Sequence, residues 1–247
     1  MSRVTNAIKR RLPTPILNAL RTYRGGNDKL KAFSGLSTKD VFTKIYEDAY
    51  WGRVGDREQV FFSGSGSRDT AVETYVAAVE NFVRSLDHKP DVVDLGCGDF
   101  HVGSRVRPLC GRYVACDIVD ALIESDAERY DAMGVDFRTL DLAHDDLPAG
   151  EVVFVRQVLQ HLSNAEIARA VDRIPAQYRY LILTEHIPRE PFPHNLDFPS
   201  GPDNRVTINS GIVLTSAPFD MGAMEETTLC EVREWGGIIR TILYRFR

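Results

Sequence analysis

From residue 91 onward, short apolar runs alternate with stretches that have the spacing of amphipathic helices. The apolar runs predict five strands, at residues 91–95, 113–117, 137–140, 152–155 and 180–184. Between them, residues 121–133 predict a helix that Gly134 can end, and Ser163-x-x-Glu166 is a capping box that opens a further helix. Strands that alternate with helices predict an α/β fold, in which a mostly parallel sheet carries helices on both faces.

The pattern changes after the fifth of these strands. Residues 187–204 hold five prolines and no period, which predicts a long loop of the kind that often forms a lid or a binding segment. Two β-rich runs follow, at 227–232 and 238–246, and Trp235-Gly236-Gly237 between them predicts a hairpin.

Residues 39–74 predict a helical or lid segment that precedes the sheet. Tyr46 and Tyr50 are four residues apart and would share one helix face, and the serine-glycine run at 63–67 ends that helix. Tyr46, Trp51 and residues 63–67 are therefore candidate contacts with a ligand, and a helix packed on the sheet edge is the alternative. The apolar spacing at residues 72–83 predicts the next helix.

The composition fits a globular chain of 247 residues with 26% charged and 43% hydrophobic residues. It excludes a collagen-like, coiled-coil or wholly disordered chain. No apolar run reaches the roughly 18 residues that a membrane span needs. The four cysteines form no C-x-x-C pair and no disulfide framework, which is typical of a reducing compartment, so we expect a cytoplasmic location.

Charge is distributed unevenly along the chain. Residues 1–31 contain eight basic residues and one acid, a net charge of +7, so the other 216 residues carry −12 against a total of −5. An acidic body disfavours a nucleic-acid partner. We interpret residues 1–38 as a basic N-terminal arm without the apolar core of a secretory signal. A solvated arm is one reading, and docking to the inner membrane face or to an acidic partner is the other.

The sharpest chemical feature is the turn after the first strand, where Asp94 precedes Gly96-Cys97-Gly98. Two glycines one residue apart allow a tight turn and a close approach to a ligand. Asp117 ends the second strand, 19 residues after Gly98, where an acid can accept hydrogen bonds from ribose hydroxyls. A dinucleotide would meet negative charge beside its pyrophosphate here, whereas a cationic sulfonium nucleoside suits these acids.

These residues resemble the class I S-adenosylmethionine-dependent methyltransferases over roughly residues 75–247. The match consists of Asp94 to Gly98, Asp117, Asp141 after the third strand, and Gln157 to Leu162 after the fourth; Phe100 stands where many members have glycine. The resemblance implies S-adenosylmethionine as cofactor and a Rossmann-like, seven-stranded sheet whose last strand is antiparallel. It implies that Asp94 and the glycines hold the methionine part, Asp117 the ribose and Asp141 the adenine. The cofactor-binding residues expected from it are Asp94, Gly96, Cys97, Gly98, Asp117, Asp141 and Gln157.

Methyl transfer to an alcohol needs alignment and a base that takes the hydroxyl proton. His161 follows the fourth strand and His186 the fifth, so both are candidate catalytic bases, with a packing role as the alternative for each. Residues of the proline-rich loop could line the acceptor pocket, namely His194, Asn195, Asp197 and Arg205. No metal site is expected, because the spacing of His186 and His194 matches no strong ligand pattern.

The sequence thus predicts O-methylation of a small molecule or a sugar or glycan precursor. The alternatives are N-methylation of a small amine or natural product, a non-catalytic partner subunit with this fold, and a nicotinamide-dependent oxidoreductase. The oligomeric state is unknown from the sequence.

Overall fold

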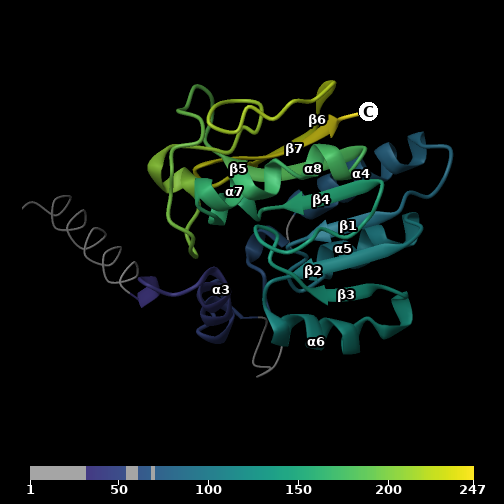
Figure 1. Cartoon of the computed structure of the whole chain (residues 1–247), viewed down its shortest axis with the longest axis horizontal. Helices are drawn as coiled ribbons and strands as arrows, with labels where there is room; N and C mark the ends of the chain where they lie inside the picture. The colour runs from purple at the N-terminus through teal and green to yellow at the C-terminus, as the bar shows by residue number, and fades with distance from the viewer. Residues whose placement is uncertain (1–31, 54–60, 68–69) are drawn as a thin grey trace, which may run out of the picture. The chain divides into compact units, whose positions relative to one another are not determined.

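The computed structural model describes residues 32–53, 61–67 and 70–247 (Figure 1). The chain divides into two compact units, residues 1–37 and 38–247, and the second contains the whole sheet. The basic segment 1–31 lies outside the described residues, so the predictions made for it stay predictions.

Seven strands form one sheet in the order β3-β2-β1-β4-β5-β7-β6. The first five strands pair in parallel, and β7 runs antiparallel to both β5 and β6. This confirms the predicted α/β fold, a seven-stranded sheet with an antiparallel last strand. The strands are β1 (Val92–Leu95), β2 (Tyr113–Asp117), β3 (Asp136–Thr139), β4 (Val152–Arg156), β5 (Tyr180–Ile187), β6 (Glu225–Glu234) and β7 (Gly237–Arg245).

Helices cover both faces of this sheet (Figure 1). The described α-helices are α3 (Thr38–Glu47), α4 (Thr70–Ser85), α5 (His101–Val106), α6 (Asp120–Arg129), α7 (Asn164–Val171) and α8 (Ile174–Gln177). Short 3₁₀ turns connect them at η1 (Ser65–Ser67), η2 (Arg107–Leu109), η3 (Asp131–Met133), η4 (Leu159–His161) and η5 (Arg205–Ile208).

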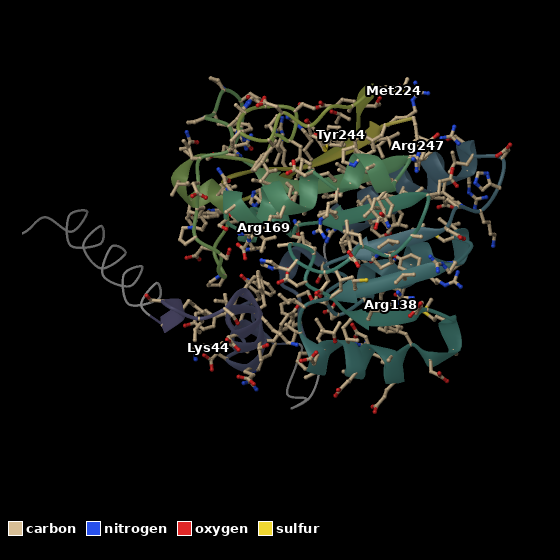
Figure 2. All side chains as sticks on the ribbon, viewed as in Figure 1. Lys44, Arg138, Arg169, Met224, Tyr244 and Arg247 are labelled. Atoms are coloured by element: carbon tan, nitrogen blue, oxygen red, sulfur yellow. The ribbon has the colours of Figure 1, made fainter. Side chains whose placement is uncertain are left out.

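The sheet has a separate hydrophobic core on each face. Successive side chains of a strand point to opposite faces, so alternate residues of each strand belong to different cores. On one face, Val93 and Val153 pack with apolar residues of α7, α8 and β7, among them the fully buried Tyr244 (Figure 2). On the other face, Tyr113 and Phe154 pack with α4 and α5. Burial on both faces explains why β1, β2 and β4 are almost continuously apolar.

Local signals set several helix ends as the sequence predicts. Ser163 is the N-cap of α7, its hydroxyl accepting from the Glu166 amide while the Glu166 carboxylate accepts from the Ser163 amide. The predicted 121–133 helix is instead α6 followed by η3, and Gly134 ends η3 with a φ of 60°.

The prediction that Tyr46 and Tyr50 share a helix face is wrong. Helix α3 ends at Glu47, and Ala49 has a left-handed backbone with a φ of 50°. The chain therefore turns before Tyr50, and the aromatic residues on either side of the turn belong to different local structures.

The proline-rich loop is longer than predicted and runs from residue 188 to 224, between β5 and β6. Arg205, whose side chain is fully buried, fixes it by donating to the carbonyls of Leu196, Leu159 and Leu162 and to Asn164 Oδ1. The predicted hairpin is confirmed, since β6 and β7 flank a turn at residues 235–236. Among the described residues, no helix has the length and apolar character of a membrane span.

Candidate active site

A cavity of about 430 Å³ opens at the carboxyl ends of β1, β2 and β4, where the strand order reverses. Ligands of open α/β sheets bind at this position. The structure brings all nine predicted site residues into the cavity wall: Asp94, Gly96, Cys97, Gly98, Asp117, Asp141, Gln157, His161 and His186.

The glycine turn has a backbone that only glycine adopts without strain. Gly96 and Gly98 have φ values of +77° and +56°. A Cβ on Gly96 would lie 2.4 Å from Val158 Cγ2, and one on Gly98 would lie 2.5 Å from Ser63 Oγ. The amides of Gly96 and Cys97 both donate to the Cys116 carbonyl, at 2.8 and 2.9 Å, which ties the turn to β2.

Two buried carboxylates flank this turn. Asp94 accepts a 2.9 Å hydrogen bond from the Tyr113 hydroxyl at Oδ2, and burial raises its pKa to about 6. Asp117 accepts from the amides of Gly98 at 3.1 Å and Val119 at 3.2 Å, and burial raises its pKa to about 6 as well. Neither carboxylate forms an ion pair within the described chain, so each could accept from a cation or a hydroxyl donor of a ligand.

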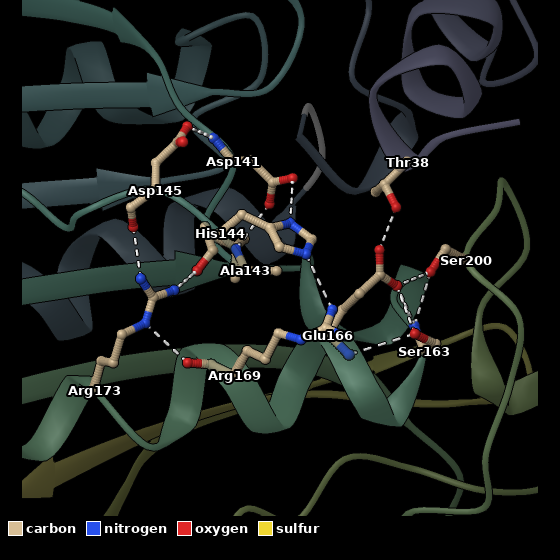
Figure 3. Close-up of polar contacts among 11 residues, drawn as sticks. Thr38, Asp141, Ala143, His144, Asp145, Ser163, Glu166, Arg169, Arg173 and Ser200 are labelled. Carbon is tan, nitrogen blue, oxygen red and sulfur yellow. Dashed lines mark hydrogen bonds and ion pairs between the residues drawn. The ribbon is translucent and has the colours of Figure 1, made fainter.

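Asp141 has local partners for both carboxylate oxygens (Figure 3). Oδ1 accepts from the Ala143 amide at 2.8 Å, and Oδ2 lies 2.8 Å from His144 Nδ1. Its own amide donates to Asp145 at 2.8 Å. Asp141 thus organises the turn after β3, and its contact with an adenine stays a prediction.

The serine-glycine run at residues 63–67 lies against the glycine turn. It belongs to the segment that the sequence predicts to be helical or a lid, and we call Tyr46, Trp51 and this run the cover. Ser63 Oγ accepts from the Asp99 amide at 2.8 Å, and the Ser63 amide donates to the Asp99 carboxylate at 3.2 Å. Ser63 Oγ also lies 2.9 Å from the Tyr46 hydroxyl. Next to it, the Gln157 side chain packs on Gly66, where a Cβ would come within 2.4 Å of Oε1.

Trp51 joins this cover to the proline-rich loop. Its ring lies edge-on to Tyr46 at 5.4 Å and contacts His161 at 5.2 Å, and its Nε1 donates to the Pro202 carbonyl at 3.1 Å. Both Tyr46 and Trp51 line the cavity. The segment after α3 and the loop after β5 therefore meet at one wall.

The hydrogen bonds of His161 define its tautomer. Gln160 Oε1 accepts from the His186 amide at 2.8 Å, which turns Gln160 Nε2 toward His161 Nε2 at 3.1 Å. An amide nitrogen only donates, so His161 Nε2 is the acceptor and its Nδ1 donates to the Asp203 carbonyl at 3.2 Å. Burial lowers the pKa of His161 to about 4. The imidazole is neutral, and both of its nitrogens are engaged.

His186 has a freer imidazole at the β5 end of the cavity. Its Nδ1 lies 3.5 Å from Asn204 Nδ2, which is a long contact, and both residues line the cavity. Its Nε2 is buried near Gly237 and forms no hydrogen bond. Burial lowers the pKa of His186, so the ring is neutral near pH 7. Of the two predicted bases, His186 has the geometry that suits proton acceptance.

Four loop residues that could have lined the acceptor pocket are not among the cavity-lining residues, namely His194, Asn195, Asp197 and Arg205. Their polar groups hold the loop together instead. Asn195 donates to three carbonyls of residues 213–217, and Asp197 accepts from the Asn164 amide. The loop residues that do reach the cavity are Pro202 and Asn204.

Sequence reasoning missed Arg156, the last residue of β4. Its Nη2 donates to the Gly66 carbonyl at 2.6 Å, and its guanidinium lies 5.2 Å from the Tyr75 ring centroid. Among the described lining residues it is the only lysine or arginine. The wall also carries six carboxylate residues, Asp94, Asp99, Asp117, Asp141, Glu166 and Glu234. No group of three or more His, Cys, Asp or Glu in the described part of the chain is arranged to hold a metal ion.

No family model matches the chain, and no curated protein matches its sequence. Solved structures do match. Magnesium protoporphyrin IX methyltransferase from Synechocystis PCC 6803, crystallised with bound S-adenosylhomocysteine, has a TM-score of 0.58 and 17% identity over 85% of this chain and 98% of that one. N-methyltransferase NodS from Bradyrhizobium japonicum WM9, in complex with the same compound, has a TM-score of 0.58 and 12% identity over 82% and 98%.

A third similar structure is the bifunctional kinase-methyltransferase WbdD, with a TM-score of 0.51 and 16% identity over 77% of this chain. The match covers 44% of the WbdD chain, so the present chain spans less than half of that protein. These likenesses concern the fold of the chain. The chain therefore has the fold of the class I S-adenosylmethionine-dependent methyltransferases, as its sequence predicted.

Proposed function

We propose that this chain is an S-adenosylmethionine-dependent methyltransferase that methylates a hydroxyl of a small molecule or of a sugar or glycan precursor. The observation that supports the cofactor assignment is the glycine turn, which lies between Ser63 and Val158. The carboxylates of Asp94 and Asp117 flank it, and neither forms an ion pair within the described chain. Carboxylates there suit a ligand with a positive ammonium and ribose hydroxyls. A wall with six carboxylate residues and one arginine disfavours a dinucleotide pyrophosphate.

The residues of this chain have distinct proposed roles toward the cofactor and the acceptor. Asp94 and the turn of Gly96, Cys97 and Gly98 would hold the methionine part, Asp117 the ribose, and Asp141 the adenine, with Gln157 closing the far side. S-adenosylmethionine supplies an electrophilic methyl group on a positively charged sulfur. The cover formed by Tyr46, Trp51 and Ser63 would exclude water and align the acceptor.

His186 supports O-methylation. Its Nδ1 lone pair is satisfied only by a long contact with Asn204, so an acceptor hydroxyl could displace that contact and give up its proton there. An unprotonated amine acceptor needs no such base, so N-methylation of a small amine remains the runner-up. A third candidate, a non-catalytic subunit with the same fold, would bind the cofactor weakly or show no turnover with any acceptor.

The test combines cofactor binding with methyl transfer. We expect S-adenosylhomocysteine to bind in calorimetry, and labelled S-adenosylmethionine to methylate members of a panel of sugar and small-molecule alcohols. His186→Ala should lower turnover of the best alcohol by about 10²- to 10⁴-fold, since a positioned base contributes that much. Binding of S-adenosylhomocysteine should stay unchanged. His88→Ala, at an exposed histidine outside the cavity, is the matched control.

Each alternative has its own outcome. Faster transfer to amines, with tolerance of His186→Ala, would favour the N-methyltransferase. Weak cofactor binding, or no turnover with any acceptor, would favour the partner subunit. The proposal fails if a nicotinamide dinucleotide binds and S-adenosylhomocysteine gives no heat.

A further inference from the structure

One corner of the cavity lies where β5, the loop after it and the β6–β7 hairpin meet. His186 of β5 pairs with Ile239 of β7, and both residues line the cavity. Asn204, in the loop, has its side-chain Nδ2 3.5 Å from His186 Nδ1. The hairpin contributes Glu234 and Trp235, which also line the cavity. We call these five residues the hairpin corner.

Close packing fixes the hairpin turn against the loop after β5. A Cβ on Gly237 would overlap the Ile187 carbonyl, and one on Gly236 would lie 3.1 Å from Val206 Cγ1. The Val206 amide donates to Asn204 Oδ1 at 3.2 Å, so the residue that contacts the hairpin turn also orients the Asn204 side chain. The hairpin turn and Asn204 therefore have a fixed arrangement.

The polar groups of the hairpin corner have hydrogen-bonding capacity left over. Glu234 Oε1 accepts from the Trp235 amide at 3.1 Å, and its Oε2 has no hydrogen-bond partner among the described residues. Asn204 Nδ2 carries two N–H donors, and its contact with the described chain is the long one to His186. The corner therefore presents acceptors at Glu234 and His186 Nδ1 and a donor at Asn204.

Trp235 adds a flat apolar surface to these polar groups. With 84% of its surface exposed, it is the most exposed large hydrophobic residue in the described part of the chain. The face of an indole carries partial negative charge, so it attracts C–H groups that neighbouring oxygens polarise. A sugar ring presents such C–H groups on its faces and hydroxyls around its edge. An exposed indole beside free donors and acceptors therefore has the chemistry that binds a sugar ring.

The mixture of donors and acceptors distinguishes a sugar from other methyl acceptors. A hydroxyl both donates and accepts, so neighbouring hydroxyls of one ring can satisfy Glu234, His186 and Asn204 together. An ammonium group only donates, and it would leave the Asn204 donors unmatched. A phosphate or carboxylate group only accepts, and it would meet the negative charge of Glu234.

We propose that the hairpin corner is the subsite for a neutral sugar ring of the methyl acceptor. The ring stacks on Trp235, and Glu234 and Asn204 bind two of its neighbouring hydroxyls. A further hydroxyl of the same ring then faces His186, whose Nδ1 is the proposed base. This assignment rests on the proposed function and narrows its acceptor to a sugar, either free or within a glycan precursor.

The competing explanation is that Trp235 is only an exposed turn residue, since single apolar side chains are common on protein surfaces. The two explanations differ in which ligand responds to a substitution. An indole that binds the acceptor affects sugar binding and leaves S-adenosylhomocysteine binding unchanged. A turn residue without a ligand affects neither, and a residue that supports the fold affects both.

Binding measurements on the full chain separate these explanations. Calorimetry first establishes that S-adenosylhomocysteine binds, and saturation-transfer NMR in its presence then measures the weak binding of three kinds of probe. These are the methyl glycosides of glucose, galactose and mannose, then cyclohexanol, which has a single hydroxyl, and cyclohexylamine, which is positively charged at pH 7. We expect at least one glycoside to bind about 10-fold more tightly than both cyclohexyl compounds, because it alone offers neighbouring hydroxyls.

Substitutions in the hairpin then test the individual contacts. Trp235→Ala should weaken binding of that glycoside by about 10-fold, because the stacking surface is lost, and Trp235→Phe should recover most of the loss. Glu234→Gln should weaken it by about 5- to 10-fold, because the one remaining acceptor oxygen is used by the Trp235 amide. All three variants should bind S-adenosylhomocysteine within about 3-fold of the wild-type chain, since these side chains are not buried.

Met224→Ala is the control and should leave glycoside binding unchanged, because Met224 (Figure 2) is also an exposed apolar residue but does not line the cavity. Two results would overturn the assignment: no glycoside binding by a chain that binds S-adenosylhomocysteine, or glycoside binding that Trp235→Ala does not weaken. Tighter binding of cyclohexylamine than of any glycoside would also overturn it, in favour of an amine acceptor. A wild-type chain that does not bind S-adenosylhomocysteine would overturn the proposed function itself.

Discussion

At the scale of single residues, the site combines a rigid backbone with two buried carboxylates that form no ion pair within the described chain. Gly96 and Gly98 fix the turn, and the turn brings Asp94 and Asp117 to one end of the cavity. Burial raises the pKa of both acids to about 6, far above their usual value of 3.8. Their charge state therefore changes within an experimentally convenient pH range, and cofactor binding should change with it.

We expect S-adenosylhomocysteine binding to weaken as the pH falls from 7 to 5. Both acids are ionised above pH 6 and protonated below it, and the ionised forms are the ones that accept from an ammonium and a ribose. The association constant should fall about 10-fold if one group must lose a proton on binding and about 100-fold if both must. Calorimetry across this range in buffers of different ionisation enthalpy counts the protons released.

Asp94→Asn should remove one group from this pH dependence and flatten the curve, whereas Asp131→Asn, at an exposed acid outside the cavity, should leave it unchanged. The sign for stability is opposite. A folded pKa above the unfolded value means that the unliganded fold loses stability as the pH rises through about 6. As the pH rises through about 6, we therefore expect S-adenosylhomocysteine to bind more tightly while the unliganded fold becomes less stable. Binding that does not depend on pH would contradict this expectation.

Residue-level prediction succeeded where the backbone itself demands a residue type, and it failed where side chains meet across distant segments. The one acid and the two glycines of residues 94–98 can be recognised in the sequence, because a tight turn needs glycine and a buried acid needs a partner. Arg156 can be recognised only in the structure, where Gly66, ninety residues earlier in the chain, supplies its acceptor. The partners of Asn195 and Arg205 are likewise non-local carbonyls, which the sequence alone does not identify.

At the scale of elements, Glu166 joins three segments at the edge of the cavity (Figure 3). Its carboxylate accepts from Thr38 at the start of α3, from the amide and hydroxyl of Ser163 at the cap of α7, and from Ser200 in the loop after β5. These hydrogen bonds lower the pKa of Glu166 although burial opposes them. Tyr46 lies on α3 and its hydroxyl is hydrogen-bonded to Ser63 Oγ. The contacts of Glu166 therefore support the segment that covers the glycine turn.

We expect Glu166→Gln to loosen this cover. An amide nitrogen cannot accept, so either the one donor at Oε1 or the three donors at Oε2 lose their acceptor. The free energy of unfolding should therefore fall by about 1–3 kcal/mol. Hydrogen exchange of the amides in α3 should become faster, and S-adenosylhomocysteine should dissociate faster. Glu128→Gln, at an exposed position of α6, is the matched control. Loss of stability without faster exchange in α3 would contradict the proposed link.

Element boundaries follow the same division between local and distant causes. The capping box that starts α7 is a four-residue signal, and it forms as predicted. The end of α3 depends on the left-handed backbone of Ala49, a conformation that is rare for alanine and is not predicted from the sequence. The fold of residues 188–224 depends on Arg205 reaching three carbonyls outside its own turn, which no local pattern encodes.

At the scale of the whole molecule, charge is divided between a segment of +7 at residues 1–31 and a remainder of −12. The segment lies outside the described residues, so its role rests on charge alone. We propose that it docks the chain to a negatively charged membrane surface, where each basic residue near the surface contributes about 1 kcal/mol and the acidic remainder is repelled. The attraction should be screened by salt.

The full chain should sediment with vesicles that contain anionic lipid and remain in solution with neutral vesicles. Replacing Lys9, Arg10 and Arg11 by glutamine removes three charges, so binding should weaken by up to about 100-fold. Lys39, Lys44 and Arg53 lie outside the segment, and their replacement by glutamine is the charge-matched control that should leave vesicle binding intact. Equal vesicle binding by all three proteins, or vesicle binding that salt does not change, would identify the basic segment as a solvated arm. Electrostatic docking must depend both on the charges of the segment and on the salt concentration.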